Sequence, residues 1–189
     1  RTHRVEEKEM KATGIVRRID DLGRIVIPKE IRRTLRIREG DPLEIYTEKD
    51  GEVIFKKYSP MGDLQDFAAQ MCESIGKNTG HIAAVADRDA IIAVAGAPKR
   101  ELLEKRNSAE LEQLMEQRKS YRYRSGDTRL RAAEAVERYH LGVAAPIIAE
   151  GDLMGCVMLL MNDNDIAPTE AEQKLAQTVA CFLGRQMEN

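Results

Sequence analysis

Residues 10–35 read MKATGIVRRIDDLGRIVIPKEIRRTL, a pattern of two β-branched runs around a turn. The runs at 15–19 and 25–27 are rich in Ile and Val, which favour strands. The four residues between them, 20–23, are Asp-Asp-Leu-Gly, a combination that favours a turn. The stretch therefore predicts a β-hairpin.

A short helix is predicted directly after this hairpin. Pro28 ends the second run and suits the first position of a helix, because its φ is already helical and that position needs no N–H partner. Ile31 and Leu35 lie four residues apart and form one apolar stripe over 29–35. The basic side chains of this segment therefore fall on other faces of the helix.

A second hairpin completes a small first domain, residues 10–58. Residues 43–47 alternate with period two, Asp50-Gly51 is a strong hairpin-turn dipeptide, and 53–55 returns. The predicted order is strand, strand, short helix, strand, strand. A unit of this size buries too little apolar surface to be comfortably stable alone, so we expect two copies to share strands.

Charge is distributed unevenly along the chain. The net charge is −2, yet residues 10–38 hold nine basic and three acidic residues, and seven of the nine are Arg. Residues 59–189 hold 15 basic and 20 acidic residues. A basic first domain before an acidic body favours a nucleic acid as the partner of the first domain. A two-fold dimer would lay its arginines along a duplex.

Residues 10–35, with Gly40-Asp41 and the segments 43–46 and 56–58, resemble the AbrB-type transition-state regulators. The resemblance spans nearly the whole first domain. It implies a dimeric, β-rich swapped-hairpin barrel with a short helix, and double-stranded DNA as its partner. The DNA-contacting residues that it implies are Arg17, Arg24, Arg32 and Arg33. We expect Arg18 and Lys29 to be additional phosphate contacts.

Residues 59–189 predict an α+β domain with a central antiparallel sheet and a helix at each end. The first helix starts at Ser59-Pro60, and Gly76–Gly80 is expected to end it. Thr169 and Glu172 form a capping box that starts the last helix. The strands are expected at 81–86, 90–95, 141–149 and 153–161, with a further helix over 108–118.

The order of these elements, with the apolar segments 143–148 and 154–157, resembles a GAF sensor domain. An AbrB-type domain joined to a GAF-like domain resembles a family of tetrameric, DNA-binding regulators of forespore gene expression in spore-forming bacteria. The resemblance implies a dimer through the barrel and a tetramer through the GAF-like domain. It also implies a cytoplasmic location, at the nucleoid of the forespore.

A GAF-like fold offers a pocket, expected here between the hairpin 81–95, the connection 96–131 and the strands 141–161. Whether a small molecule binds there, and which, stays open. The Arg-rich part of the connection, 118–131, is interpreted as a solvated loop, with an anionic ligand as the alternative. Part of the apolar stripes on the two terminal helices is expected to form contacts between subunits.

Neither a metal site nor an enzyme is predicted, and no cofactor is expected. The three His are far apart and have no Cys or His neighbour at ligand spacing. Cys72, Cys156 and Cys181 form no CxxC pair, so they favour a reducing compartment, and all three are interpreted as core residues. The lack of such a pair argues against the alternative of a thiol reductase of the GAF type.

Three further interpretations concern the chain as a whole. Residues 1–9 precede the first patterned residue, Met10, and are interpreted as a tag or upstream extension. No apolar run approaches the length of a membrane span, so no membrane partner is expected. An antitoxin with the same barrel, or a structural nucleoid protein, is the alternative to a regulator. The 130 or so patterned residues after the barrel argue against both.

Overall fold

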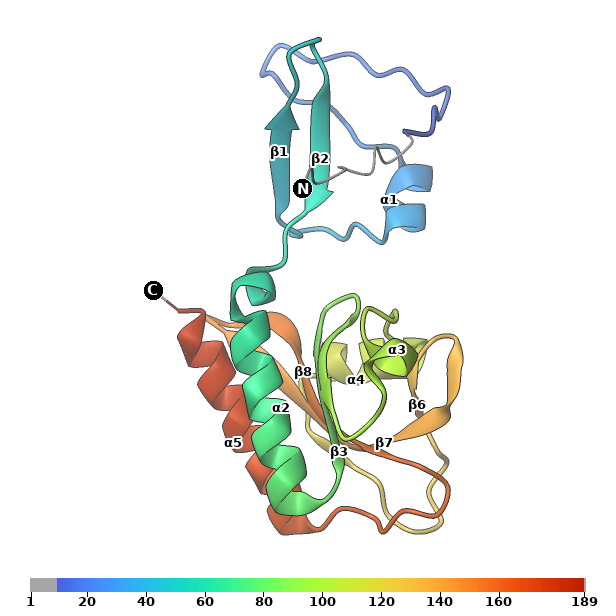
Figure 1. The fold of residues 1–189 in the computed structure, drawn as a ribbon. Coiled ribbons are helices and arrows are strands. Elements are labelled where there is room, and N and C mark those ends of the chain that lie inside the picture. Colours follow the sequence, from blue (N-terminus) through green and yellow to red (C-terminus); the bar gives the residue numbers. More distant parts are fainter. Residues whose placement is uncertain (1–9, 189) are drawn as a thin grey trace, which may run out of the picture. The chain divides into compact units, whose positions relative to one another are not determined.

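The computed structural model describes residues 10–188, which form two compact units. One unit ends at Tyr58 and the other begins at Ser59 (Figure 1). The interpretation of residues 1–9 lies outside the described residues. Within residues 10–188, no helix is long and apolar enough to cross a membrane.

The first unit contains one helix and one regular hairpin. Helix α1 (Lys29–Leu35) begins directly after Pro28, as the sequence predicts. Strands β1 (Leu43–Thr47) and β2 (Val53–Lys57) pair antiparallel around the Asp50-Gly51 turn. The bounds of α1 and β1 are confirmed, and β2 extends two residues beyond the predicted strand.

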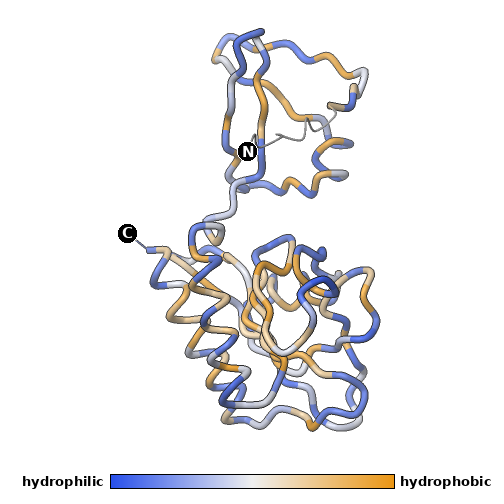
Figure 2. Tube along the Cα trace, in the orientation of Figure 1, coloured by the Kyte–Doolittle hydropathy of each residue, from blue (hydrophilic) through white to orange (hydrophobic). Residues whose placement is uncertain are grey.

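The two strands predicted at 15–19 and 25–27 are wrong for this chain taken by itself. Neither run takes part in a β-ladder, although the turn between them does form. The predicted hairpin is limited to its turn, and nearly every side chain along the two runs is exposed. Figure 2 shows hydrophobic residues along the tube of this unit, and most of the large ones are exposed.

The second unit is built on a six-stranded antiparallel sheet in the order β4-β3-β8-β7-β5, with β6 also paired to β7. Its strands are β3 (Ile82–Asp87), β4 (Ile91–Ala95), β5 (Tyr121–Arg122), β6 (Arg131–Ala133), β7 (Val136–Ala149) and β8 (Asp152–Met161). Its helices are η1 (Pro60–Leu64), α2 (Gln65–Thr79), α3 (Lys99–Leu102), α4 (Ala109–Gln117) and α5 (Glu170–Gln186). The α+β class with an antiparallel sheet and terminal helices is confirmed.

The sheet separates two apolar layers. In β3, Ala83 and Val85 pack toward α2 and α5, whereas Ala84 and Ala86 pack toward α3 and α4. This alternation is the ordinary period of two of a strand that is covered on both faces. Figure 1 shows α2 and α5 side by side on one face of the sheet.

The start and the end of the first helix of this unit differ from the expectation. Ser59 makes no side-chain cap, and a 3₁₀ turn precedes α2. Gly76 lies inside α2 rather than ending it, and the helix stops at Gly80, whose φ is +74°. One glycine with a left-handed φ is sufficient to end a helix.

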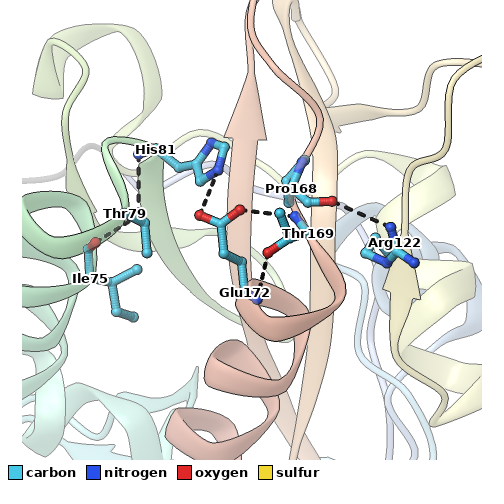
Figure 3. Close-up of polar contacts among 7 residues, drawn as sticks. All are labelled: Ile75, Thr79, His81, Arg122, Pro168, Thr169 and Glu172. Carbon is cyan, nitrogen blue, oxygen red and sulfur yellow. Dashed lines mark hydrogen bonds and ion pairs between the residues drawn. The ribbon is translucent and has the colours of Figure 1, made fainter.

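The start of α5 is fixed by the predicted capping box and by a contact distant in sequence. The Glu172 N–H donates to Thr169 Oγ1 at 3.2 Å, and the Thr169 N–H donates to Glu172 Oε1 at 2.9 Å. The other carboxylate oxygen of Glu172 lies 2.9 Å from His81 Nε2, just before β3 (Figure 3). The carboxylate thereby joins the first turn of α5 to the junction between α2 and β3.

Candidate nucleic-acid interface

The turn at residues 20–24 is held by the carboxylate of Asp20. The Asp20 N–H donates to the Arg24 carbonyl at 2.9 Å, and the Gly23 N–H donates to the Asp20 carbonyl at 3.1 Å. Gly23 has a φ of +75°, which the closing position of a three-residue hairpin loop requires. Asp20 Oδ1 also accepts the N–H groups of Leu22 at 2.9 Å and Arg24 at 2.8 Å.

The same carboxylate holds the side chain of Arg24. Asp20 Oδ2 accepts from Arg24 Nε at 2.8 Å, while the Arg24 side chain is 69% exposed. The pKa of Asp20 lies below its ordinary value, first because of the Arg24 N–H and also because of the Arg24 guanidinium. The turn thus presents a cation whose orientation is set by an acid four residues earlier.

Arg17 and Arg18 precede this turn and are exposed. Among residues 10–188, the Arg17 guanidinium donates only to the neighbouring Val16 carbonyl, at 3.3 Å. Both side chains are therefore accessible to an anionic partner.

The other three predicted contacts, Lys29, Arg32 and Arg33, are exposed on α1. The end of this helix is well defined, because Arg36 adopts a left-handed φ of +54° and the Ile37 N–H returns to the Arg32 carbonyl at 2.8 Å.

A lysine from the neighbouring hairpin also supports the end of α1. Lys57 Nζ on β2 donates to the Arg36 carbonyl at 2.8 Å. The lysine places a positive charge at the negative end of the helix dipole and connects α1 to the regular hairpin.

The six candidate cations thus form two local groups, one around the turn and one on α1. Arg24 alone among the six has a carboxylate partner within residues 10–188. Exposed guanidinium groups suit bidentate contacts to phosphate or to guanine. The sequence reasoning interpreted Asp20 only as a turn residue. Its contact with Arg24 is signalled by an acid at the first position of the turn and an arginine four residues later.

The Arg-rich connection of the second unit is largely occupied by contacts within that unit. Arg129 pairs with Asp163 at 2.7 Å, Arg122 donates to the Pro168 carbonyl at 3.4 Å, and Arg118 donates to the Gly151 carbonyl. These contacts tie loops together, which leaves these arginines poorly suited to an anionic ligand.

The expected pocket is only partly where the sequence analysis places it. The sheet face toward α3 and α4 is filled by large side chains such as Leu102, Leu111 and Tyr139. A hollow of about 260 Å³ lies instead beside α5, and a shallower one of about 440 Å³ follows the outer side of that helix. The first hollow is lined by Arg118, Ser120, Ala145, Pro146, Ile148, Gln177 and Cys181.

The cysteines separate into two kinds. Burial raises the pKa of both Cys72 and Cys156 to about 12, so both are inert thiols in the core. Cys181 is exposed on α5, which corrects the expectation that it belongs to the core. Cys181 follows the buried Ala180 directly. Helical spacing alone therefore assigned it to the buried face of α5, although its side chain lies outside that face.

Two family models match the chain. Residues 63–188 match the model of the C-terminal domain of stage V sporulation protein T, described as a transcription factor. Residues 16–63 match the model of MazE, an antidote-toxin recognition protein and bacterial antitoxin.

Two proteins of Bacillus subtilis strain 168 are similar in sequence. Stage V sporulation protein T is 49% identical over 179 residues, which is 95% of this chain and 99% of that protein. The transition state regulatory protein AbrB is 63% identical over 51 residues, which is 27% of this chain and 52% of AbrB. The solution structure of the N-terminal DNA recognition domain of AbrB aligns with 27% of this chain, and the alignment includes 94% of that domain's chain. The sequence identity is 61% and the TM-score is 0.23.

The second unit has the fold of a GAF domain. The GAF domain of an Acinetobacter phosphoenolpyruvate-protein phosphotransferase aligns with 70% of this chain, and the alignment includes 84% of that domain's chain. The TM-score is 0.51 and the sequence identity is 12%. At this identity the likeness concerns the fold alone.

Proposed function

Because the chain belongs to the stage V sporulation protein T family of transcription factors, with an AbrB-type DNA-recognition domain and a GAF domain, we propose that it regulates sporulation genes from within the forespore. Its target is double-stranded DNA, which it binds with a loose sequence preference in the cytoplasm of the bacterium. Residues 10–58 bind the DNA, and residues 59–189 assemble the subunits and receive a signal.

The observation that carries this proposal is the exposure of the six cations at 17, 18, 24, 29, 32 and 33, and the 63% identity to AbrB over 51 residues supports it. Contacts to phosphate supply most of the affinity in this arrangement, with limited reading of base edges. Tolerance of sequence follows, because DNA shape and deformability contribute where bases are not contacted. No chemical step is assigned to any residue.

The first unit is proposed to function as a dimer, because one chain leaves its apolar side chains in water. Of the large hydrophobic residues that are exposed within residues 10–188, thirteen lie between Met10 and Tyr58 and three lie beyond. A soluble domain with so little buried apolar surface needs a partner. A second copy whose hairpin pairs with the runs at 15–19 and 25–27 supplies both the missing ladder and the missing core.

The GAF unit is proposed to join two such dimers into a tetramer through α2 and α5. Leu175 and Phe182 on α5 are 37% and 42% exposed, and the Phe182 ring lies 5.7 Å from that of Phe67 on α2. Two dimeric DNA-binding units in one assembly would raise avidity without new base contacts.

A second candidate function is that of an antitoxin, which the match of residues 16–63 to the MazE model favours. An antitoxin would bind a toxin protein as well as DNA. The 126 residues that match the sporulation family favour the regulator, because they form a folded domain in place of a short toxin-binding tail.

The test is duplex binding by the full chain across a series of salt concentrations, with the Arg32→Ala/Arg33→Ala double variant. We expect this variant to weaken binding to all sequences and to lower the salt slope by about 1 for each phosphate that is no longer neutralised. The matched control is Lys99→Ala/Arg100→Ala, which removes the same charge from exposed positions of α3 and should leave the slope unchanged. Equal slopes in the wild type and in the Arg32/Arg33 variant would reject the proposed interface.

A further inference from the structure

The turn before α1 contains an acid in a position that is unfavourable for a DNA-binding surface. Asp20 lies among the cations of residues 17–33, where its charge repels phosphate. Its carboxylate nevertheless accepts three N–H groups, and one of them is the side-chain Nε of Arg24 at 2.8 Å. The charge of Asp20 disfavours DNA binding, whereas its contact with Arg24 favours it if that arginine binds DNA.

The contact through Nε leaves the outer edge of the guanidinium available. The two terminal nitrogens of Arg24 have no further partner within residues 10–188, and the side chain is largely exposed. A bidentate contact to a phosphate or to a guanine edge uses these terminal nitrogens. The acid therefore holds the arginine by the one nitrogen that such a contact can spare.

Restraint of Arg24 before binding reduces the conformational entropy that binding must remove. A long side chain that becomes immobile at an interface loses rotamer freedom, and a side chain that is already held loses less. The other candidate cations have no such support within residues 10–188. Arg17 donates only to its neighbour's carbonyl there, and the exposed side chains of the rest make no hydrogen bond or ion pair.

We propose that Asp20 is a positioning residue for DNA recognition, which orients the Arg24 guanidinium toward the duplex through the Nε contact. This inference rests on the proposed function, since it requires Arg24 to contact DNA. It assigns an acidic residue a favourable role in DNA binding. Removal of its charge should therefore weaken binding, whereas charge repulsion alone predicts that binding would become tighter.

The experiment measures duplex affinity of the full-length Asp20→Asn variant at fixed salt. The Asn oxygen still accepts the N–H groups of Leu22 and Arg24, so the turn is retained, but its amide nitrogen cannot accept from Arg24 Nε. We expect affinity to fall by about 3-fold to 10-fold, the range that corresponds to the freedom of one long side chain. The matched control is Asp21→Asn, which removes the same charge one residue later, from an exposed side chain that makes no hydrogen bond or ion pair within residues 10–188. This control should bind as tightly as the wild type or more tightly.

A double-mutant cycle with Arg24→Ala separates positioning from a role in the turn. In the Arg24→Ala background, Asp20→Asn should no longer weaken binding, because the positioned group is gone. An equal loss in both backgrounds would overturn the inference, since it would assign Asp20 to the turn alone. Tighter binding by Asp20→Asn in the wild-type background would overturn it as well, since repulsion would then be the whole effect.

The arms also distinguish this inference from the proposed function. If Arg24→Ala alone binds as the wild type does while Arg32→Ala/Arg33→Ala is impaired, the inference is wrong and the proposed function stands. If neither variant changes the affinity or its salt slope, the proposed interface itself is wrong.

Discussion

Gly184 on α5 packs directly against the backbone carbonyl of Ile148 on β7. A Cβ at Gly184 would fall well inside the contact distance of the Ile148 oxygen and 3.1 Å from its carbonyl carbon. The close approach occurs on the buried side of α5, which also carries Val179 and Leu183. Glycine at this position therefore sets the distance between the helix and the sheet.

We expect Gly184→Ala to destabilise the GAF unit by about 1–3 kcal/mol. The added methyl group meets rigid backbone, so α5 must move outward, and the cost of such overpacking exceeds the gain of about 1 kcal/mol in helix propensity. Guanidinium denaturation of the full chain, followed by far-UV circular dichroism, measures the change. The matched control is Gly76→Ala in α2, where the new Cβ would meet its nearest neighbour at 3.4 Å. That variant should be as stable as the wild type or more stable.

Glu150→Asn should stabilise the hairpin between β7 and β8. Ala149 pairs with Asp152, so Glu150 and Gly151 form a two-residue loop, with φ values of +50° and +83°. Two positive φ values are typical of the turn for which Asn-Gly is the preferred sequence. Asn tolerates a left-handed backbone conformation better than Glu does, so the substitution should raise the free energy of unfolding by about 0.5–1 kcal/mol. Glu150→Val, which places a β-branched residue at a positive φ, should have the opposite effect.

Glu172→Gln should lower the free energy of unfolding at neutral pH, and the difference from the wild type should disappear at acidic pH. Burial raises the pKa of Glu172, but the Thr169 N–H and His81 more than compensate, so the pKa lies below its ordinary value of 4.5. A carboxyl whose pKa is lowered on folding stabilises the protein above its unfolded pKa, and this contribution disappears as the pH falls through the folded pKa.

The measurement for Glu172 is the difference in unfolding free energy between wild type and variant from pH 7 to pH 3. We expect about 1 kcal/mol at pH 7, decreasing toward zero below pH 4. Glu170→Gln controls for the helix dipole, because Glu170 lies in the same first turn. A difference for Glu172→Gln that does not depend on pH would contradict the role given to the carboxylate charge.

Cys72 and Cys156 should resist alkylation in the native protein. Burial raises the pKa of both thiols to about 12, so almost no thiolate is present at pH 8. Mass spectrometry after iodoacetamide treatment should find no label on either residue until the chain is denatured. The Cys181→Ser variant lacks the exposed thiol, so its native state should take up no label. Rapid modification of Cys156 in that variant would reopen the thiol reductase alternative.

The features that sequence reasoning predicted well are those with local causes. Pro28 and the spacing of Ile31 and Leu35 are sufficient to define α1, and the Thr169–Glu172 box defines the start of α5. Asp50-Gly51 fixes the register of β1 and β2. In each case the deciding contacts lie within a few residues of one another.

The features that it missed depend on contacts distant in sequence. The partner of Glu172 is His81, 91 positions earlier, and no local pattern indicates that the two meet. Gly76, where α2 continues beyond the predicted end, lies close to His81 and to Ala95, which is 19 residues later. At the candidate interface, residue types and spacing identified the cations, whereas the second role of Asp20 emerged only with the side-chain geometry.

The exposed apolar side chains of residues 10–58 also affect how such a regulator responds to its own abundance. If the DNA-binding part gains its core only when two chains meet, folding and pairing of that part are a single equilibrium. While chains are scarce, the amount of competent protein rises with the square of their concentration, so doubling synthesis yields nearly four times as many binding units. Promoter occupancy would then change over a narrow range of expression, without any ligand.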